Sequence, residues 1–205
     1  MAMLVFLFIL SLHATLGFET GPPVDKNAGL CKSMFPGHNV AAQTTKPSPF
    51  KFFPSQTCFT SGQEVLIQIN TTKDEINGMF IQARSGTFST AQKSHGTFRS
   101  SQKNTSPLKC FNDKDSFGHK GKIGSKSVAV VWKAPDEGLV IDIQIGGTIL
   151  LKQTEFWVNE FVKLKFNKTC EQQSLGENGS SALISSFSQV LLLLMTGVVS
   201  IFLQH

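Results

Sequence analysis

Residues 31–38, with the sequence CKSMFPGH, bring together side chains that can do chemistry. A cysteine thiolate can act as a nucleophile or bind a metal, methionine sulfur is a ligand for copper, and an imidazole serves as a base or a metal ligand. Cys31, Met34 and His38 therefore raise the question of whether this segment is a site or a piece of scaffold. The elements around it decide the answer.

The chain begins with an apolar, uncharged run, MLVFLFILSLHATL at residues 3–16, followed by Gly17. Thr15 and Gly17 place small residues at both positions that a signal peptidase inspects. This pattern predicts a signal peptide over residues 1–17. A transmembrane helix is the alternative, although the run is shorter than the roughly 20 residues that a bilayer requires.

A second apolar run, VLLLLMTGVVSIFL at residues 190–203, lies close to the C-terminus, and no Lys or Arg follows it as in a stop-transfer helix. A polar spacer precedes this run, as in GPI-attachment signals. We therefore expect residues 171–181 to be a linker with the attachment site and residues 182–205 to be a removed signal. The lipid would be attached at one of three small residues, Asn178, Gly179 or Ser180. A C-terminal transmembrane anchor is the alternative.

About 160 residues remain, enough for one domain. We assign residues 18–30 to an N-terminal segment and residues 31–170 to the domain. The formal charge of +5 is weak evidence for anionic surfaces such as bacterial envelopes, and no basic run indicates nucleic-acid binding. The densest basic group lies in residues 113–126, a segment that we expect to be an exposed loop with an irregular strand. Its members are Lys114, His119, Lys120, Lys122 and Lys126, and an ordinary solvated loop is the other interpretation.

The cysteines and sequons indicate an oxidising, glycosylating compartment. The cysteines are even in number and contain no C-x-x-C pair, which predicts two disulfides among Cys31, Cys58, Cys110 and Cys170. Sequons for N-glycosylation occur at Asn70, Asn104 and Asn167. A fourth sequon, at Asn178, competes with the lipid site.

The hydrophobic pattern alternates with a period of two through most of the mature chain, which indicates half-buried antiparallel strands. Val65, Ile67 and Ile69 share one face of a predicted strand at 64–70. Other strands are predicted at 78–84, 96–100, 126–132, 139–145, 148–153 and 156–166. Turn residues separate them, among them Gly146-Gly147 between two strands. Short strands with turns between them predict an all-β sandwich.

The octapeptide also begins a series of motifs. Its C-x-x-M-x-P-x-H pattern is followed by Gln43, PSPF at 47–50, SGQEVLIQI at 61–69, GMFIQAR at 78–84, GTF at 96–98, Leu108 with Cys110, WKAP at 132–135, and Phe156-Trp157. In this order they resemble the reelin (reeler) domain family, over roughly residues 31–162. Within it, the chain is similar to the single-domain defence proteins of insects.

The resemblance implies an immunoglobulin-like antiparallel β-sandwich with a Cys31–Cys110 disulfide. That pairing leaves Cys58 for Cys170, although family members differ in the position of the second pair. A disulfide-bonded cysteine is neither a thiolate ligand nor a nucleophile, so the octapeptide is interpreted as scaffold. Met34 is expected to plug the core. His38 is expected to be a structural imidazole, hydrogen-bonded at the end of the first strand, with metal or ligand binding as the alternative.

No enzyme motif is present: the chain has no G-x-S-x-G, H-E-x-x-H, P-loop or dinucleotide pattern, and His95 and His119 stand alone in polar segments. We expect no catalysis, no metal and no cofactor. The resemblance implies a defence-related binding module in the extracellular space or on the cell surface, with an unknown ligand such as a microbial surface. An adhesion or matrix-interaction domain is one alternative. A membrane protein related to reeler-containing ferric reductases, without the reductase core, is another.

Overall fold

The structure is a computed structural model that describes residues 21–86 and 93–171. The predicted signal peptide at 1–17, the lipid-attachment residues Asn178, Gly179 and Ser180, and the apolar tail at 182–205 lie outside the described residues. Among the residues that are described, no helix is both long and apolar enough to cross a membrane.

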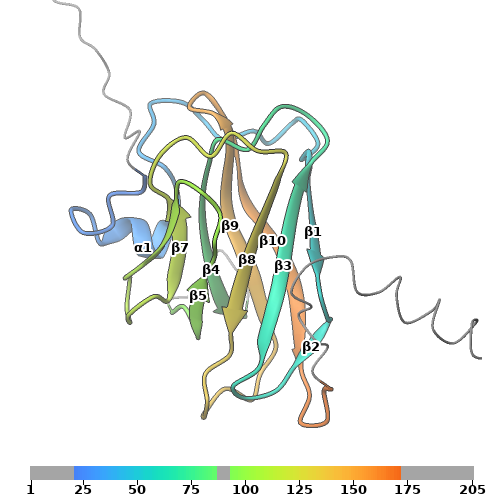
Figure 1. Cartoon of the computed structure of the whole chain (residues 1–205). Coiled ribbons are helices and arrows are strands. Elements are labelled where there is room, and N and C mark those ends of the chain that lie inside the picture. Colours follow the sequence, from blue (N-terminus) through green and yellow to red (C-terminus); the bar gives the residue numbers. More distant parts are fainter. Residues whose placement is uncertain (1–20, 87–92, 172–205) are drawn as a thin grey trace, which may run out of the picture. The chain divides into compact units, whose positions relative to one another are not determined.

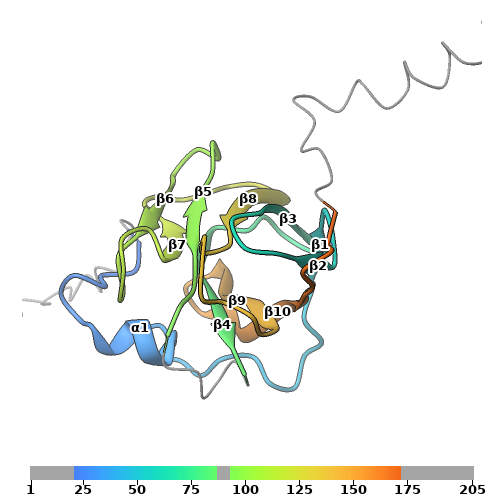
Figure 2. The same ribbon diagram turned by 90° about the horizontal axis from the view of Figure 1, so that it is seen from below.

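Two sheets face each other (Figure 1). The first has four strands in the order β1 (Phe50–Pro54), β3 (Glu64–Thr71), β8 (Ser127–Lys133) and β5 (Thr97–Arg99). The second has six, in the order β2 (Cys58–Phe59), β10 (Glu155–Phe166), β9 (Ile143–Lys152), β4 (Gly78–Ser85), β7 (Ser116–His119) and β6 (Thr105–Leu108). Seen from below, β3 and β8 lie in one layer and β4, β9 and β10 in the other (Figure 2). The expected β-sandwich is confirmed, and among the paired strands only β2 runs parallel to its neighbour, β10.

The core lies between the sheets and follows the alternation in the sequence. Val65, Ile67 and Ile69 of β3 are fully buried, because every second side chain of a strand points to the same face. In β8 the buried Trp132 packs edge-on against Phe59, with ring centroids 5.1 Å apart. The predicted strands at 64–70, 78–84, 96–100, 126–132 and 156–166 correspond to β3, β4, β5, β8 and β10.

The prediction of two strands separated by a Gly146-Gly147 turn is wrong. One continuous strand, β9, runs through both glycines, and the chain before Ile143 is not strand. Ile141, which alternation within the predicted strand at 139–145 puts on the same face as Ile143, is 49% exposed, whereas Ile143 is buried. The glycines are needed for close packing, since an added Cβ would lie 1.9 Å from the Glu160 oxygen at Gly146 and 2.1 Å from the Phe80 oxygen at Gly147.

The segment at 113–126 was predicted to be an exposed loop with an irregular strand, and the strand is present but buried. It contains β7, which pairs with β4 and β6 and whose Ser116, Phe117 and Gly118 are buried. The turn before β7 is held by the buried carboxylate of Asp115. This carboxylate accepts hydrogen bonds from three backbone N–H groups, at 2.8–2.9 Å, of Cys110, Phe111 and Asn112.

Two disulfides link distant parts of the chain. Cys31 pairs with Cys110, as the resemblance implied, and the remaining cysteines, Cys58 and Cys170, pair with each other. The first ties the short helix α1 (Gly29–Ser33) to the segment that follows β6, and the second ties β2 to the end of the described domain. Each disulfide closes a long loop and so restricts the unfolded chain. In the chain-entropy model, this stabilises the folded state by roughly 4–5 kcal/mol per disulfide.

Candidate functional site: a pocket on the outer face of the six-stranded sheet

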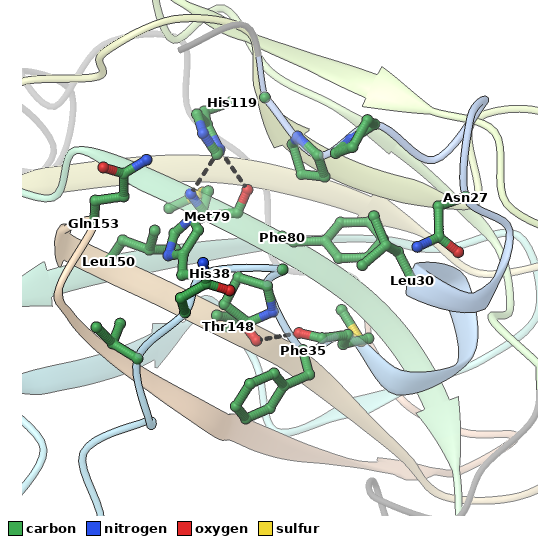
Figure 3. A pocket seen from close by; sticks show the side chains of 18 of the residues that line it. Asn27, Leu30, Phe35, His38, Met79, Phe80, His119, Thr148, Leu150 and Gln153 are labelled. Atoms are coloured by element: carbon green, nitrogen blue, oxygen red, sulfur yellow. Dashed lines mark hydrogen bonds between the residues drawn. The ribbon is translucent and has the colours of Figure 1, made fainter. Parts of the chain in front are cut away.

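A pocket of about 520 Å³ lies between residues 21–40 and the outer face of β4 and β9. From here on, residues 21–40 are called the N-terminal segment. The sheet contributes Phe80, Thr148 and Leu150 to it. Phe80 points away from the main core, because its neighbours Met79 and Ile81 point into that core. The N-terminal segment contributes Met34 and residues 35–40. Its Leu30, Phe35 and His38 are labelled in Figure 3.

Buried hydrogen bonds hold the N-terminal segment in place. The guanidinium of Arg84, at the end of β4, donates to the backbone oxygens of Cys31 at 2.7 Å and Lys32 at 2.9 Å. Burial lowers the pKa of Arg84 to about 10, which leaves it protonated at neutral pH. The Thr148 hydroxyl donates to the Met34 oxygen at 2.5 Å. The helix end that carries Cys31 and Met34 is therefore fixed against the sheet.

Met34 is buried, as predicted, but it packs with Phe80 on the outer face and not between the sheets. It ends α1 in a left-handed conformation, with φ of 53°, and its backbone N–H donates to the Leu30 oxygen. Residues 34–38 of the octapeptide also form part of one wall of the pocket.

His38 departs from the prediction of a hydrogen-bonded imidazole at the end of the first strand. It lies in the chain between α1 and β1, and its ring is edge-on to Phe156 with centroids 5.6 Å apart. Its Nδ1 atom is buried without a hydrogen-bond partner among the described residues.

His119 is at the end of β7 and is half-buried, whereas the sequence placed it in a solvated loop. Its Nδ1 lies 3.1 Å from the Met79 nitrogen and 3.0 Å from the Met79 oxygen, so the ring bonds to the backbone of β4 in either neutral tautomer (Figure 3). Burial lowers the pKa of His119, the bond to the Met79 backbone raises it, and the charge of His38 lowers it, with a net decrease. The side chain stays neutral near pH 7.

The pocket is poor in charged groups. Among the described residues that line it, Lys26 is the one Lys or Arg, and none is acidic. Within the same part of the chain, no three His, Cys, Asp or Glu residues are grouped closely enough to hold a metal ion.

His95 also differs from its predicted isolation. Its Nε2 lies 3.1 Å from the Ser85 hydroxyl, and its backbone oxygen accepts a hydrogen bond from the Trp132 indole at 2.8 Å. Burial, and next the charge of Lys93, lower the pKa of His95. A serine hydrogen-bonded to a histidine can act as a nucleophile with its base. Such a site also needs a group that orients the histidine and hydrogen-bond donors that stabilise an oxyanion. The described residues show neither at His95.

The predicted basic group is not a single loop. Lys114 comes before β7 and Lys120 after it, so they lie at opposite ends of the β6–β7 pair. Lys126 comes directly before β8, and the ring of His119 is part of the pocket wall. Lys120 and Lys122 are exposed and both lie beside Asn104, whose backbone oxygen accepts from the Lys120 N–H and whose side chain donates to the Lys122 oxygen.

The three sequons occupy different environments. Asn167 is exposed after β10, Asn70 is partly buried in β3, and the Asn104 amide donates to the Lys122 oxygen at 2.6 Å. Glycosylation at these positions stays a prediction. A glycan at Asn104 would stand next to Lys120 and Lys122.

Sequence reasoning missed the pocket, although β4 carries a signal for it. Seven consecutive residues of this strand, GMFIQAR, are buried. A strand that is apolar on both faces is covered on both faces. The run Met79-Phe80-Ile81 therefore indicated that a further element lies on the outer face of the sheet.

A reeler domain family model matches residues 29–172. Two insect proteins match along most of their own length. "Putative defense protein 3" of Antheraea mylitta is 26% identical over 76% of this chain and 92% of that protein. "Putative defense protein Hdd11" of Hyphantria cunea is 30% identical over 75% of this chain and 91% of that protein.

"Putative ferric-chelate reductase 1" of Danio rerio is 30% identical over 64% of this chain, which spans only 22% of that protein. The fold is that of solved reeler domains: the Reelin-N domain of F-spondin matches 62% of this chain and 92% of its own, with a TM-score of 0.50 and 14% identity. Human F-spondin fragment 2 matches 67% of this chain and 99% of its own, with the same TM-score and 13% identity. The chain therefore belongs to the reeler domain family.

Proposed function

We propose that the protein is a non-enzymatic binding module of innate defence that acts outside the cell, held on the cell surface by a lipid, and that it contacts microbial surfaces. The observation that carries this proposal is the extent of the match to the insect proteins, which covers 91–92% of their length. Proteins named for defence thus consist of little more than this domain. The match to the reductase covers too small a share of that protein for its name to be transferred.

The chemistry of the domain is consistent with this role. The two disulfides fit an oxidising extracellular compartment. The pocket on the outer face of the six-stranded sheet is mostly apolar with few polar groups, which is typical of binding sites. The exposed Lys120 and Lys122 offer a positive contact for the anionic polymers of a bacterial envelope.

The experiment is co-sedimentation of the purified, glycosylated protein with intact bacteria at physiological salt. We expect saturable binding that decreases as salt is raised, because exposed charges are screened at about 8 Å in 0.15 M salt. Immobilised extracellular matrix provides the comparison. Binding to matrix without binding to bacteria would replace the defence role with adhesion.

A further inference from the structure

The pocket between the N-terminal segment and the sheet is large enough for an organic ligand. Its volume of about 520 Å³ lies within the range of roughly 300–1,000 Å³ for small-molecule sites. It is more than three times the cavity of about 150 Å³ that holds benzene in an engineered protein. An occupant larger than a single ring is therefore expected.

The shape and lining of the pocket favour an extended apolar occupant. Asn27 and Leu30 lie at one end and Gln153 at the other, with Phe80 and His38 between them (Figure 3). Met34, Phe80 and Leu150 form the floor of the pocket, and their side chains are apolar. An alkyl chain on this floor would be removed from water, which contributes roughly 0.8 kcal/mol for each buried CH₂ group.

The charges of the pocket favour an anionic end on that occupant. Lys26 lines the rim and forms no ion pair among the described residues, and no acidic side chain lines the pocket. His119 uses Nδ1 for Met79, which leaves Nε2 to bond to a ligand. A cation would find no carboxylate here. A wholly apolar molecule would make no contact of opposite charge with the ammonium of Lys26 and no hydrogen bond to Nε2 of His119.

We propose that this pocket binds a single-chain amphiphile with an anionic head, whose chain packs on Met34, Phe80 and Leu150 and whose head lies at Lys26. Neither Lys120 nor Lys122 lines this pocket, and the proposal does not depend on the defence role. Binding of such a ligand would stand even if the protein did not bind bacteria.

The test uses the protein from animal cells, labelled with ¹³C in its methionine methyl groups and titrated with dodecanoate below its micelle-forming concentration. We expect a saturable shift of the Met34 methyl signal, assigned with the variant Met34→Leu, and one ligand bound per chain. Two matched ligands separate the contributions: butyrate has the same head with a short chain, and dodecyltrimethylammonium has the same chain with the opposite charge. Both are expected to bind at least tenfold more weakly.

Two charge-reversal variants locate the head group. Lys26→Glu is expected to weaken dodecanoate binding by about three- to tenfold, in line with an exposed ion pair. Lys51→Glu, an exposed lysine on β1 outside the pocket, is expected to leave binding unchanged. An unshifted Met34 methyl signal with dodecanoate would overturn the proposal. Equal binding of the cationic ligand, or equal weakening by both variants, would overturn the assignment of an anionic head at Lys26.

Discussion

The guanidinium of Arg84 donates a hydrogen bond of 2.7 Å to the backbone oxygen of Cys31, so the last residue but one of β4 holds a half-cystine of helix α1 against the sheet. The two residues are 53 positions apart in the sequence. The same guanidinium bonds to Lys32 and, through Nε, to Gln82 at 2.8 Å. Arg84 is thus the residue through which the sheet positions the N-terminal segment.

Replacing Arg84 with methionine should therefore destabilise the protein. The variant keeps a similar apolar stem but leaves the Cys31 and Lys32 oxygens without their donor, and hydrogen bonds to charged groups contribute roughly 1.5–3 kcal/mol. We expect a loss of about 3 kcal/mol in the free energy of unfolding, measured by urea denaturation with the fluorescence of the buried Trp132 and Trp157. Lys51→Met removes a charge at an exposed site and should change stability by less than about 0.5 kcal/mol. Equal stability of the two variants would contradict the role of Arg84.

The glycine pair of β9 gives a second test. In Gly147→Ala the new Cβ would lie 2.1 Å from the Phe80 oxygen and 2.6 Å from the Met34 methyl carbon. Because a backbone oxygen cannot move aside cheaply, we expect a loss of about 2 kcal/mol or more. Gly37→Ala is the matched control, since its Cβ would meet no atom within 4 Å. Similar denaturation midpoints for both variants would contradict the close contact between Gly147 of β9 and the Phe80 oxygen of β4.

The strands could be predicted from sequence where a single face is buried, and not elsewhere. The alternation of Val65, Ile67 and Ile69 reports directly on a strand with one buried face. The same alternation continues through Ile141, which lies before β9 and is exposed. The end of this strand could not be predicted, because nothing in the local sequence shows that pairing with β10 stops at Ile143. Gly146-Gly147 looks like a turn, but tertiary packing requires two residues without side chains inside a strand.

The site was harder to predict because its parts are distant in sequence. The short strand β7 has polar residues and is stabilised by pairing with β4 and β6, so the sequence suggested a loop and a solvated His119. The pocket itself exists because Arg84 and the Cys31–Cys110 disulfide hold residues 31–38 over β4. The motif at 31–38 identified these residues but not the surface that they cover.

The buried imidazole of His119 should make stability depend on pH. Its pKa is lower in the folded state, chiefly because of burial, than the value of about 6.5 in the unfolded chain. As pH falls through about 6.5 the unfolded state takes up the proton first, so the free energy of unfolding decreases. The decrease stops once the pH is below the pKa of the folded state.

His119→Asn should flatten the pH dependence of the free energy of unfolding between pH 7 and about 5, measured by urea denaturation. His95, whose pKa is lowered in the same direction, stays in both proteins and gives the residual slope. An unchanged slope in the variant would refute this assignment.

The exposed lysines beside Asn104 should contribute to binding of anionic surfaces. A lysine near a negatively charged membrane contributes about 1 kcal/mol, so removing two should weaken binding to phosphatidylserine vesicles by more than tenfold at low salt. The double variant Lys120→Ser/Lys122→Ser is compared with the double variant Lys51→Ser/Lys163→Ser. Lys51 and Lys163 are exposed lysines on β1 and β10. Equal affinity of the two double variants would remove Lys120 and Lys122 from the binding surface.

The most direct test of the account is whether cells that display the full-length protein capture bacteria. Cultured animal cells are transfected, the surface protein is quantified by antibody, and bound bacteria are counted before and after treatment with phosphatidylinositol-specific phospholipase C. We predict that displaying cells bind more bacteria than cells with an empty vector and lose both the protein and the bacteria after treatment. Capture equal to that of empty-vector cells, with the protein present on the surface, would contradict a surface-tethered defence module.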